Sequence, residues 1–236
     1  MEILARRSVS GSSAPRWPLI ALLSATAGAV DVIGFQRLGL FTAHITGNIV
    51  VIAAELVSGG APRPLQILAV PIFMCGVAGT WLIAKTLERR GMLLVRPLLV
   101  VQSILIGGVL LASVLDRADA RRADPMRDLA VMLAVSAMAC QFATLRIALT
   151  GAPSTAVMTG NLTGIVLSAL DIAWPKDANG GAEARLNKAG SSFLGFFLGC
   201  TAGAAAVLWL EKWAWLLPVA MSATAALVRF PMEERT

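Results

Sequence analysis

Apolar residues dominate eight long segments of this chain, which short polar stretches separate. These segments cover residues 17–35, 38–57, 65–84, 97–115, 129–149, 153–173, 191–210 and 213–228. Most are apolar on every side, whereas a helix on a soluble core needs only one apolar face. Their lengths are close to the roughly 20 residues with which an α-helix crosses a hydrocarbon core of about 30 Å. The pattern predicts an all-α integral membrane helix bundle.

Composition supports the same class. Of the 236 residues, 57% are hydrophobic and 14% are charged, against about 25% charged residues in soluble domains. The net charge of +6 comes mainly from Lys and Arg between the apolar segments, where positive charge sets membrane orientation. The sequence shows no basic face interleaved with aromatic residues, so nucleic-acid binding is not expected. The three cysteines lie apart in apolar segments, and there is one histidine, so neither a metal site nor a cofactor is expected.

One short phrase occurs twice, as FTAHITGN at residues 41–48 and as STAVMTGN at residues 154–161. Five positions match at a constant spacing of 113 residues, as from 42 to 155. The matched pairs are Thr42 and Thr155, Ala43 and Ala156, Thr46 and Thr159, Gly47 and Gly160, and Asn48 and Asn161. The spacing predicts two sequence-related halves. We expect a disordered tail (1–16), a first membrane repeat (17–115), a charged linker (116–128) and a second membrane repeat (129–229).

The sequence leaves the number of crossings open. If all eight segments cross, the two repeats are parallel; if 38–57 and 153–173 enter and return on one side, six cross and the repeats are inverted. Each arrangement places thirteen Lys and Arg on one side and seven on the other, so the positive-inside rule does not choose. Both segments are short, polar in the middle and interrupted by glycine, which slightly favours the re-entrant arrangement.

The repeated phrase supplies the first candidate site residues. A polar group left unsatisfied in hydrocarbon costs several kcal/mol, so these side chains must face protein, each other or water. One interpretation is a polar site between the two Thr-Gly-Asn segments for a small solute or an ion. The alternative is hydrogen bonding that only holds helices together. The candidates are Thr42, Thr46, Asn48, Thr155, Thr159 and Asn161.

Four further polar residues lie within apolar segments. Asp31 is near the end of the first segment, and Arg146 is at nearly the equivalent place in the fifth, so we predict that they pair across the pseudo-twofold axis. Two separate interfacial charges are the alternative. Gln141, in the middle of its segment, also requires partners. His44 can relay protons, but the second copy has valine at this place, which favours a satisfied core histidine.

Glycines at 195, 199 and 203 form a ridge of small residues in the seventh segment. Such a ridge allows a neighbouring helix to approach closely. We predict a packing surface here rather than chemistry. The ridge also allows a homodimer face, although no other pattern in the sequence supports one.

The run AGAVDVIGF at residues 27–35, followed by LGLF at 38–41 and TGN at 46–48, resembles the YoaK-like family of bacterial membrane proteins. That family carries a domain of unknown function. Gln141, Arg146 and the second TGN stand where the family shows a Gln, an Arg and a second Thr-Gly phrase. Phe142 departs from the family, which usually has Asn there. The resemblance covers about residues 17–229 and implies a multi-pass protein of the bacterial inner membrane, with no established substrate.

Three functions follow as expectations. The first is a small-solute or ion transporter or channel, with the lipid bilayer and a solute or ion as partners. The second is a structural or accessory membrane protein in which the polar groups only lock helices together. An intramembrane enzyme is the least favoured, because hydroxyls and amides are poor general acids and bases and the sequence shows no nucleophile–base or metal-ligand spacing.

Overall fold

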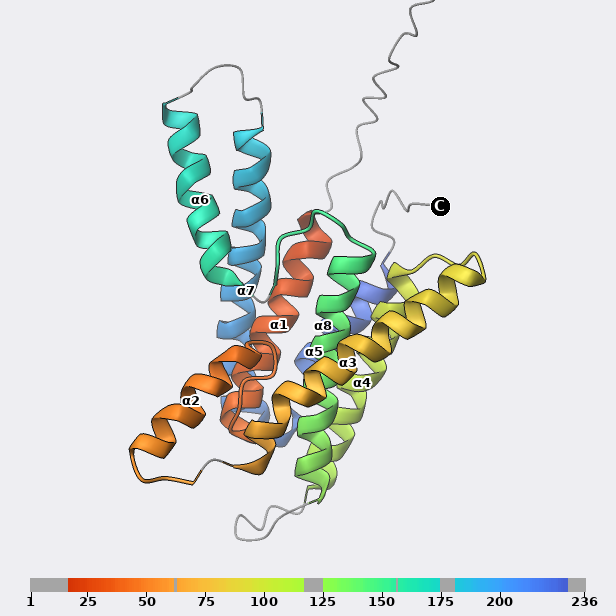
Figure 1. The fold of residues 1–236 in the computed structure, drawn as a ribbon, viewed down its shortest axis with the longest axis vertical. Helices are drawn as coiled ribbons and strands as arrows, with labels where there is room; N and C mark the ends of the chain where they lie inside the picture. The colour runs from red at the N-terminus through yellow and green to blue at the C-terminus, as the bar shows by residue number, and fades with distance from the viewer. Residues whose placement is uncertain (1–16, 62, 117–124, 156, 175–180, 229–236) are drawn as a thin grey trace, which may run out of the picture.

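The computed structural model describes residues 17–61, 63–116, 125–155, 157–174 and 181–228. In these ranges the chain forms eight α-helices and one 3-10 turn, with no strand, so the predicted all-α class is confirmed (Figure 1). The helices are α1 (Trp17–Leu38), α2 (Ile45–Val57), α3 (Pro64–Arg89), α4 (Val95–Leu115), α5 (Pro125–Ile147), α6 (Met158–Ala173), α7 (Ala182–Leu210) and α8 (Leu216–Leu227), with η1 (Glu211–Trp213) before α8. Five elements, α1, α3, α4, α5 and α7 with η1, are long and apolar enough to span a membrane.

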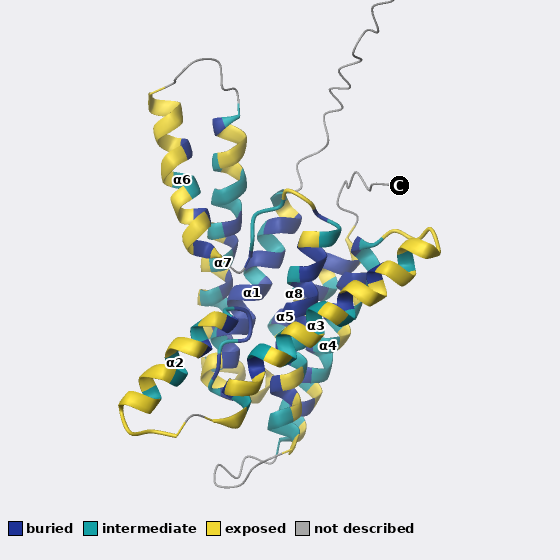
Figure 2. Cartoon of the chain, in the orientation of Figure 1, coloured by how far each residue is buried: buried dark blue, intermediate teal, exposed yellow. Residues whose placement is uncertain are grey.

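Helices α1 and α5 form the centre of the bundle and are its most buried long helices (Figure 2). They run antiparallel. Leu19 and Leu23, at the start of α1, share an apolar cluster with Leu145 and Leu149, at the end of α5 and just beyond it. The second half of α1 and the first half of α5 meet in the other cluster. Two helices that occupy equivalent places in the predicted halves therefore point in opposite directions.

Helix α7 packs along α1 in the same direction. Gly195, Gly199 and Gly203 lie against Ala21, Ala25 and Ala29, respectively. A Cβ added at position 199 would lie 2.0 Å from the Ala25 carbonyl oxygen, so only glycine permits this approach. The predicted ridge is thus a packing surface within the chain.

The remaining long helices enclose α5. Gly76 of α3 packs against Ser136 and Ala139 of α5. Helix α4 runs antiparallel to α5: Gln102 bonds to Gln141 near one end, and the Gly108 position lies against Leu133 near the other. Helix α8 is shorter, but it extends from one apolar cluster to the other, so it returns to the end at which α1 starts.

Helix α2 is a short helix that starts inside the bundle. After Leu38 the chain turns back along α1, and the backbone amide of Thr42 reaches the side chain of Asp31 at 2.9 Å. Helix α2 then runs outward again. At the start of α3, the Gln66 side chain donates to the Gly39 carbonyl oxygen at 3.1 Å. The chain therefore enters α3 at the same end of the bundle at which it left α1.

Helix α6 repeats this path from the opposite end. After α5 the chain turns inward until Thr155 reaches the Gln141 side chain at 3.2 Å. Helix α6 then runs back beside α7, held at its outer end by an ion pair of 2.8 Å between Asp171 and Arg185. Figure 1 shows α2 and α6 leaving the bundle in opposite directions. Six helices traverse the bundle, and two half-helices start inside it.

Several predicted boundaries differ from the structure. Helix α7 begins at Ala182, nine residues before the predicted seventh segment (191–210). The earlier start follows from the run AEARL, which consists of strong helix formers. Helix α5 begins at Pro125, within the expected linker, since proline suits the first helical position. The expected tail (1–16) and residues 117–124 of the linker lie outside the described residues.

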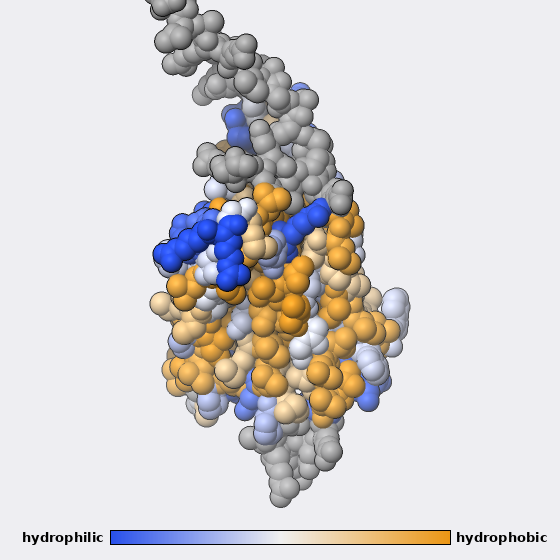
Figure 3. Space-filling view, turned by 90° about the vertical axis from the view of Figure 1, so that its right-hand side faces the viewer, coloured by the Kyte–Doolittle hydropathy of each residue, from blue (hydrophilic) through white to orange (hydrophobic). Residues whose placement is uncertain are grey.

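The surface fits a membrane. Figure 3 shows a belt of apolar side chains around the middle of the visible face, with hydrophilic residues above and below it. The chain is a multi-pass membrane protein, as predicted.

A candidate membrane site at the start of α2

The side chain of Asp31 projects from α1 toward the start of α2 and is 5% exposed. Its Oδ1 accepts hydrogen bonds from the backbone N–H groups of Thr42 at 2.9 Å and Ala43 at 2.6 Å, with His44 N–H at 3.4 Å. The first amides of a helix lack partners within the helix and carry partial positive charge. Asp31 therefore caps α2 from a neighbouring helix, about 10 Å along α1 from Leu38 at 1.5 Å per residue.

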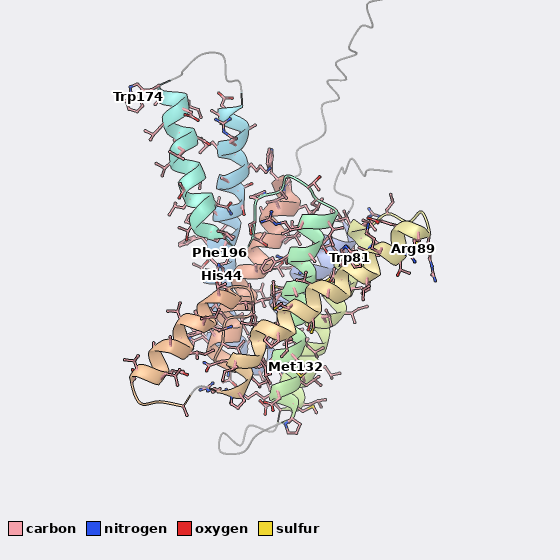
Figure 4. All side chains as sticks on the ribbon, in the orientation of Figure 1. His44, Trp81, Arg89, Met132, Trp174 and Phe196 are labelled. Carbon is pink, nitrogen blue, oxygen red and sulfur yellow. The ribbon has the colours of Figure 1, made fainter. Side chains whose placement is uncertain are left out.

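His44 completes this group. Its Nδ1 hydrogen-bonds with Asp31 Oδ2, which leaves Nε2 as the ring nitrogen without a carboxylate partner. The side chain is 30% exposed, and its ring meets the Phe196 ring of α7 edge-on at 5.2 Å (Figure 4). The sequence predicted a core histidine with satisfied hydrogen bonds. In the structure, the bond to Asp31 holds the ring through Nδ1.

A groove of about 430 Å³ opens beside this pair, between α1, α2 and α7. It is lined by Asp31, Val32, Phe35, Gln36, Phe41, His44, Gly47, Phe196 and Cys200. Phe35 and Phe41 stack at 4.7 Å to form one aromatic wall. The volume lies in the range of small-molecule sites, about 300–1,000 Å³. The groove is thus an apolar, aromatic space with one carboxylate–imidazole pair at its edge.

Asn48 is 1% exposed, and its amide is used within its own segment. Asn48 Nδ2 donates to the Phe41 carbonyl oxygen at 2.7 Å, and Phe41 N–H donates to Asn48 Oδ1 at 2.8 Å. These bonds close the loop that precedes α2.

Asn161 makes the corresponding contact, with Nδ2 donating to the Ser154 carbonyl oxygen at 2.9 Å, again seven residues earlier. Its Nδ2 also lies 3.1 Å from Ser192 Oγ, which bonds to Ser24 Oγ at 2.9 Å. Among the described residues, no hydrogen bond joins Asn48 and Asn161. Each amide holds its own loop. That the two asparagines line one polar site stays a prediction.

Gln141 anchors the second loop as Asp31 anchors the first. Its Nε2 donates to Thr155 Oγ1 at 3.2 Å and to the Leu23 carbonyl oxygen at 2.9 Å. Its Oε1 accepts from Gln102 Nε2 at 2.7 Å. This second anchor is neutral, and Val157 stands where the first copy has histidine. Of these two described loop anchors, only the first therefore carries groups that can exchange a proton.

Arg146 does not pair with Asp31 within the described part of the chain. It is exposed and follows Leu145, which packs beside Leu19, whereas Asp31 lies in the opposite half of α1. The prediction of this pair is wrong because α1 and α5 are antiparallel, so equivalent positions lie at opposite ends of the bundle.

The other candidates divide by position. Thr42 and Thr155 are buried in the two loops, whereas Thr46 and Thr159 are exposed on the first turns of α2 and α6 and do not line the groove. Sequence reasoning missed three buried partners of these loops, namely Ser24, Gln102 and Ser192. A polar residue within an apolar segment was the available signal for each. No group of three or more His, Cys, Asp or Glu fit to hold a metal ion occurs among the described residues.

Comparison with known proteins gives one match. A family described as "Protein of unknown function (DUF1275)" matches residues 19–228, nearly the whole chain. No curated protein and no solved structure matches the chain. The match agrees with the YoaK-like resemblance of the sequence, and we conclude that the chain belongs to the DUF1275 family.

Proposed function

We propose that this protein is a small-solute or ion transporter of the bacterial inner membrane, with its site in the groove beside Asp31 and His44. The observation that carries the proposal is the hydrogen-bonded carboxylate–imidazole pair, set about 10 Å inside the bundle and open to a groove. Ionisable groups at such depth are costly and commonly mark solute or proton pathways. The bilayer and a small solute are the proposed partners.

The two half-helices support this proposal. Asn161, near the start of α6, contacts Ser192, and His44, at the start of α2, contacts Phe196, which is one turn further along α7. The half-helices therefore begin at neighbouring levels after entering from opposite ends. Discontinuous helices in inverted repeats frame the solute sites of many transporters. We also propose that the two halves are an internal repeat, because the asparagine-to-carbonyl contact recurs at the same 113-residue spacing.

The six-crossing path also gives an orientation. With α2 and α6 re-entrant, the end at which α1 starts carries seven of the eleven Lys and Arg that the structure describes. The positive-inside rule then puts this end in the cytoplasm.

An accessory protein without transport activity is the second candidate. The closed bonds of Asn48 and Asn161 favour it, because these amides are used to hold loops. We do not propose an enzyme. His44 and Cys200 line one groove, but no hydrogen bond joins them in the described structure, and Asp31 occupies the amides that could have stabilised an oxyanion.

The test is transport by purified protein in proteoliposomes that contain a pH-sensitive dye. Representative amino acids, sugars, organic cations, organic anions and alkali-metal salts are added outside in turn, and proton movement is recorded. We expect at least one class to move protons through the wild type and not through Asp31→Asn. Asp171→Asn, which removes an exposed carboxylate outside the groove, is the control and should behave as wild type. If no class moves protons or accumulates above protein-free liposomes, the transporter proposal falls.

A further inference from the structure

The groove beside Asp31 has the chemistry of a site for an organic cation. The backbone amides at the start of a helix attract anions. Before α2, however, the amides of Thr42 and Ala43 already donate to the Asp31 carboxylate. Among the described residues, no Lys or Arg lines the groove. With a neutral imidazole, the pair of Asp31 and His44 carries one negative charge. The electrostatics of the groove therefore favour a positively charged ligand.

The aromatic lining narrows the class of cation. Phe35, Phe41 and Phe196 come from α1, the re-entrant loop and α7, and they surround the space beside the carboxylate. Aromatic faces attract cations and suit quaternary or bulky organic ones in particular. A hard metal cation requires several oxygen ligands, and among the described lining side chains only Asp31 and Gln36 carry oxygen. A lipophilic organic cation fits this lining, and an inorganic ion does not.

A proton competes for the same pair. A proton on His44 Nε2 makes the pair neutral and turns this nitrogen from an acceptor into a donor. Among the described residues, few other charged groups lie near the pair of Asp31 and His44. From α7 the facing titratable group is the Cys200 thiol, and from α2 the facing residues are Gly47 and the bonded Asn48. At the end of α1, Arg37 donates to the Val207 carbonyl oxygen, and from the start of α3, Arg63 donates to the Leu38 carbonyl oxygen.

We infer that the groove binds a lipophilic organic cation and a proton in mutually exclusive fashion, with Asp31 and His44 as the shared site. The exchange balances, because one cation enters as one proton leaves the imidazole, and the charge of the site with its occupant stays the same. This inference deepens the proposed function, on which it rests, by naming the substrate class and the coupling ion. It describes a cation–proton antiporter.

The test is binding of tetraphenylphosphonium to the full chain in detergent micelles between about pH 6 and 8, the range in which histidine titrates. We expect the apparent dissociation constant to rise by up to about tenfold per unit of falling pH, as competition with one proton requires. Binding should also release up to one proton per cation, as measured by calorimetry in buffers that differ in ionisation enthalpy. Asp31→Asn should weaken binding by at least about tenfold at pH 8 and remove the proton release, since the charge of the site is lost.

Two further variants keep the test decisive. His44→Gln keeps a hydrogen-bond donor for Asp31 but does not titrate in this range, so we expect binding at pH 8 with little pH dependence above pH 6. If Asp31→Asn does not fold, His44→Gln tests the inference in its place. Asp171→Asn is the matched control and should bind as wild type.

The outcomes separate this inference from the proposed function. Binding that is independent of pH, or unchanged in Asp31→Asn, would mean simple partition into an apolar groove and would overturn the inference. Absence of binding would also overturn it, while Asp31-dependent movement of another solute class in proteoliposomes would leave the transporter proposal standing. Coupled binding and proton release without any flux would keep the shared site and remove the transporter.

Discussion

Replacing Asp31 by alanine and by asparagine separates the two roles that the structure gives this side chain. Asp31→Ala removes the acceptor of the Thr42 and Ala43 amides, bonded at 2.9 and 2.6 Å, and also the partner of His44 Nδ1. The buried Thr42 and Ala43 amides and the half-buried His44 ring then lose their acceptor. Each unsatisfied buried donor costs about 1–3 kcal/mol, so we expect a loss of at least about 3 kcal/mol in the free energy of unfolding.

Asp31→Asn keeps an oxygen in the same place. This oxygen still accepts from both backbone amides, and the new amide group donates to His44 Nδ1 once the ring carries its proton on Nε2. Only the charge assistance of the bonds is lost. Hydrogen bonds to charged groups contribute about 1.5–3 kcal/mol and neutral ones about 1 kcal/mol, so we expect a loss of about 1–2 kcal/mol.

The assay is reversible unfolding in mixed micelles with an increasing mole fraction of sodium dodecyl sulfate, followed by helical circular dichroism. Asp171→Asn serves as the control and should unfold within about 1 kcal/mol of wild type, because its ion pair with Arg185 is exposed. Equal destabilisation by Asp31→Ala and Asp31→Asn would refute the reasoning, because the backbone amides would then not depend on an acceptor at this position.

Three further predictions follow from the packing. Gly199→Ala should lower the free energy of unfolding by about 1–3 kcal/mol, since its Cβ would meet the α1 backbone, whereas Gly79→Ala, with nothing within 4 Å, should be neutral or stabilising in the same assay. Asn48→Ala and Asn161→Ala should destabilise by similar amounts, about 1–3 kcal/mol each, and a difference above about 2 kcal/mol would contradict their equivalent roles. In a chain without its native cysteines, Ser58→Cys should react with an impermeant maleimide only from the side opposite the chain termini; reaction from the side of the termini would indicate eight crossings.

The sequence predicted the helices of this fold better than it predicted their directions. Apolar length predicted the long spans, and the repeated phrase marked the two loops that turn inside the bundle. Charge counting did not decide whether α2 and α6 cross, because both arrangements place thirteen Lys and Arg on one side and seven on the other. Contacts between residues far apart in sequence, such as Gln66 with Gly39 and Gln141 with Leu23, support the six-crossing arrangement.

The site was predicted in part. The presence of Asp31 within an apolar segment marked it as an ionisable residue that needs a partner, whereas its place near the segment end also allowed an interfacial charge. In the structure its side chain is buried. Its partners were missed, because they are backbone amides of a loop that turns back, and no side-chain pattern reports them. Arg146 was assigned to it because equal spacing in two halves suggests proximity, which inverted helices do not provide. His44 was interpreted as a core histidine because the histidine occurs in one copy only. The sequence therefore did not indicate its bond to Asp31.

Chemical access to Cys200 tests most directly whether the groove beside Asp31 and His44 opens to water. The thiol lines the groove, whereas Cys140 is buried, and Cys75, which is exposed on α3, is removed by Cys75→Ser. The measurement is the reaction of sealed vesicles containing this variant with a charged, membrane-impermeant thiol reagent, applied from each side in turn. The account predicts that Cys200 reacts from at least one side and that tetraphenylphosphonium slows the reaction. Reaction only with membrane-permeant reagents, from neither aqueous side with the charged one, would contradict it.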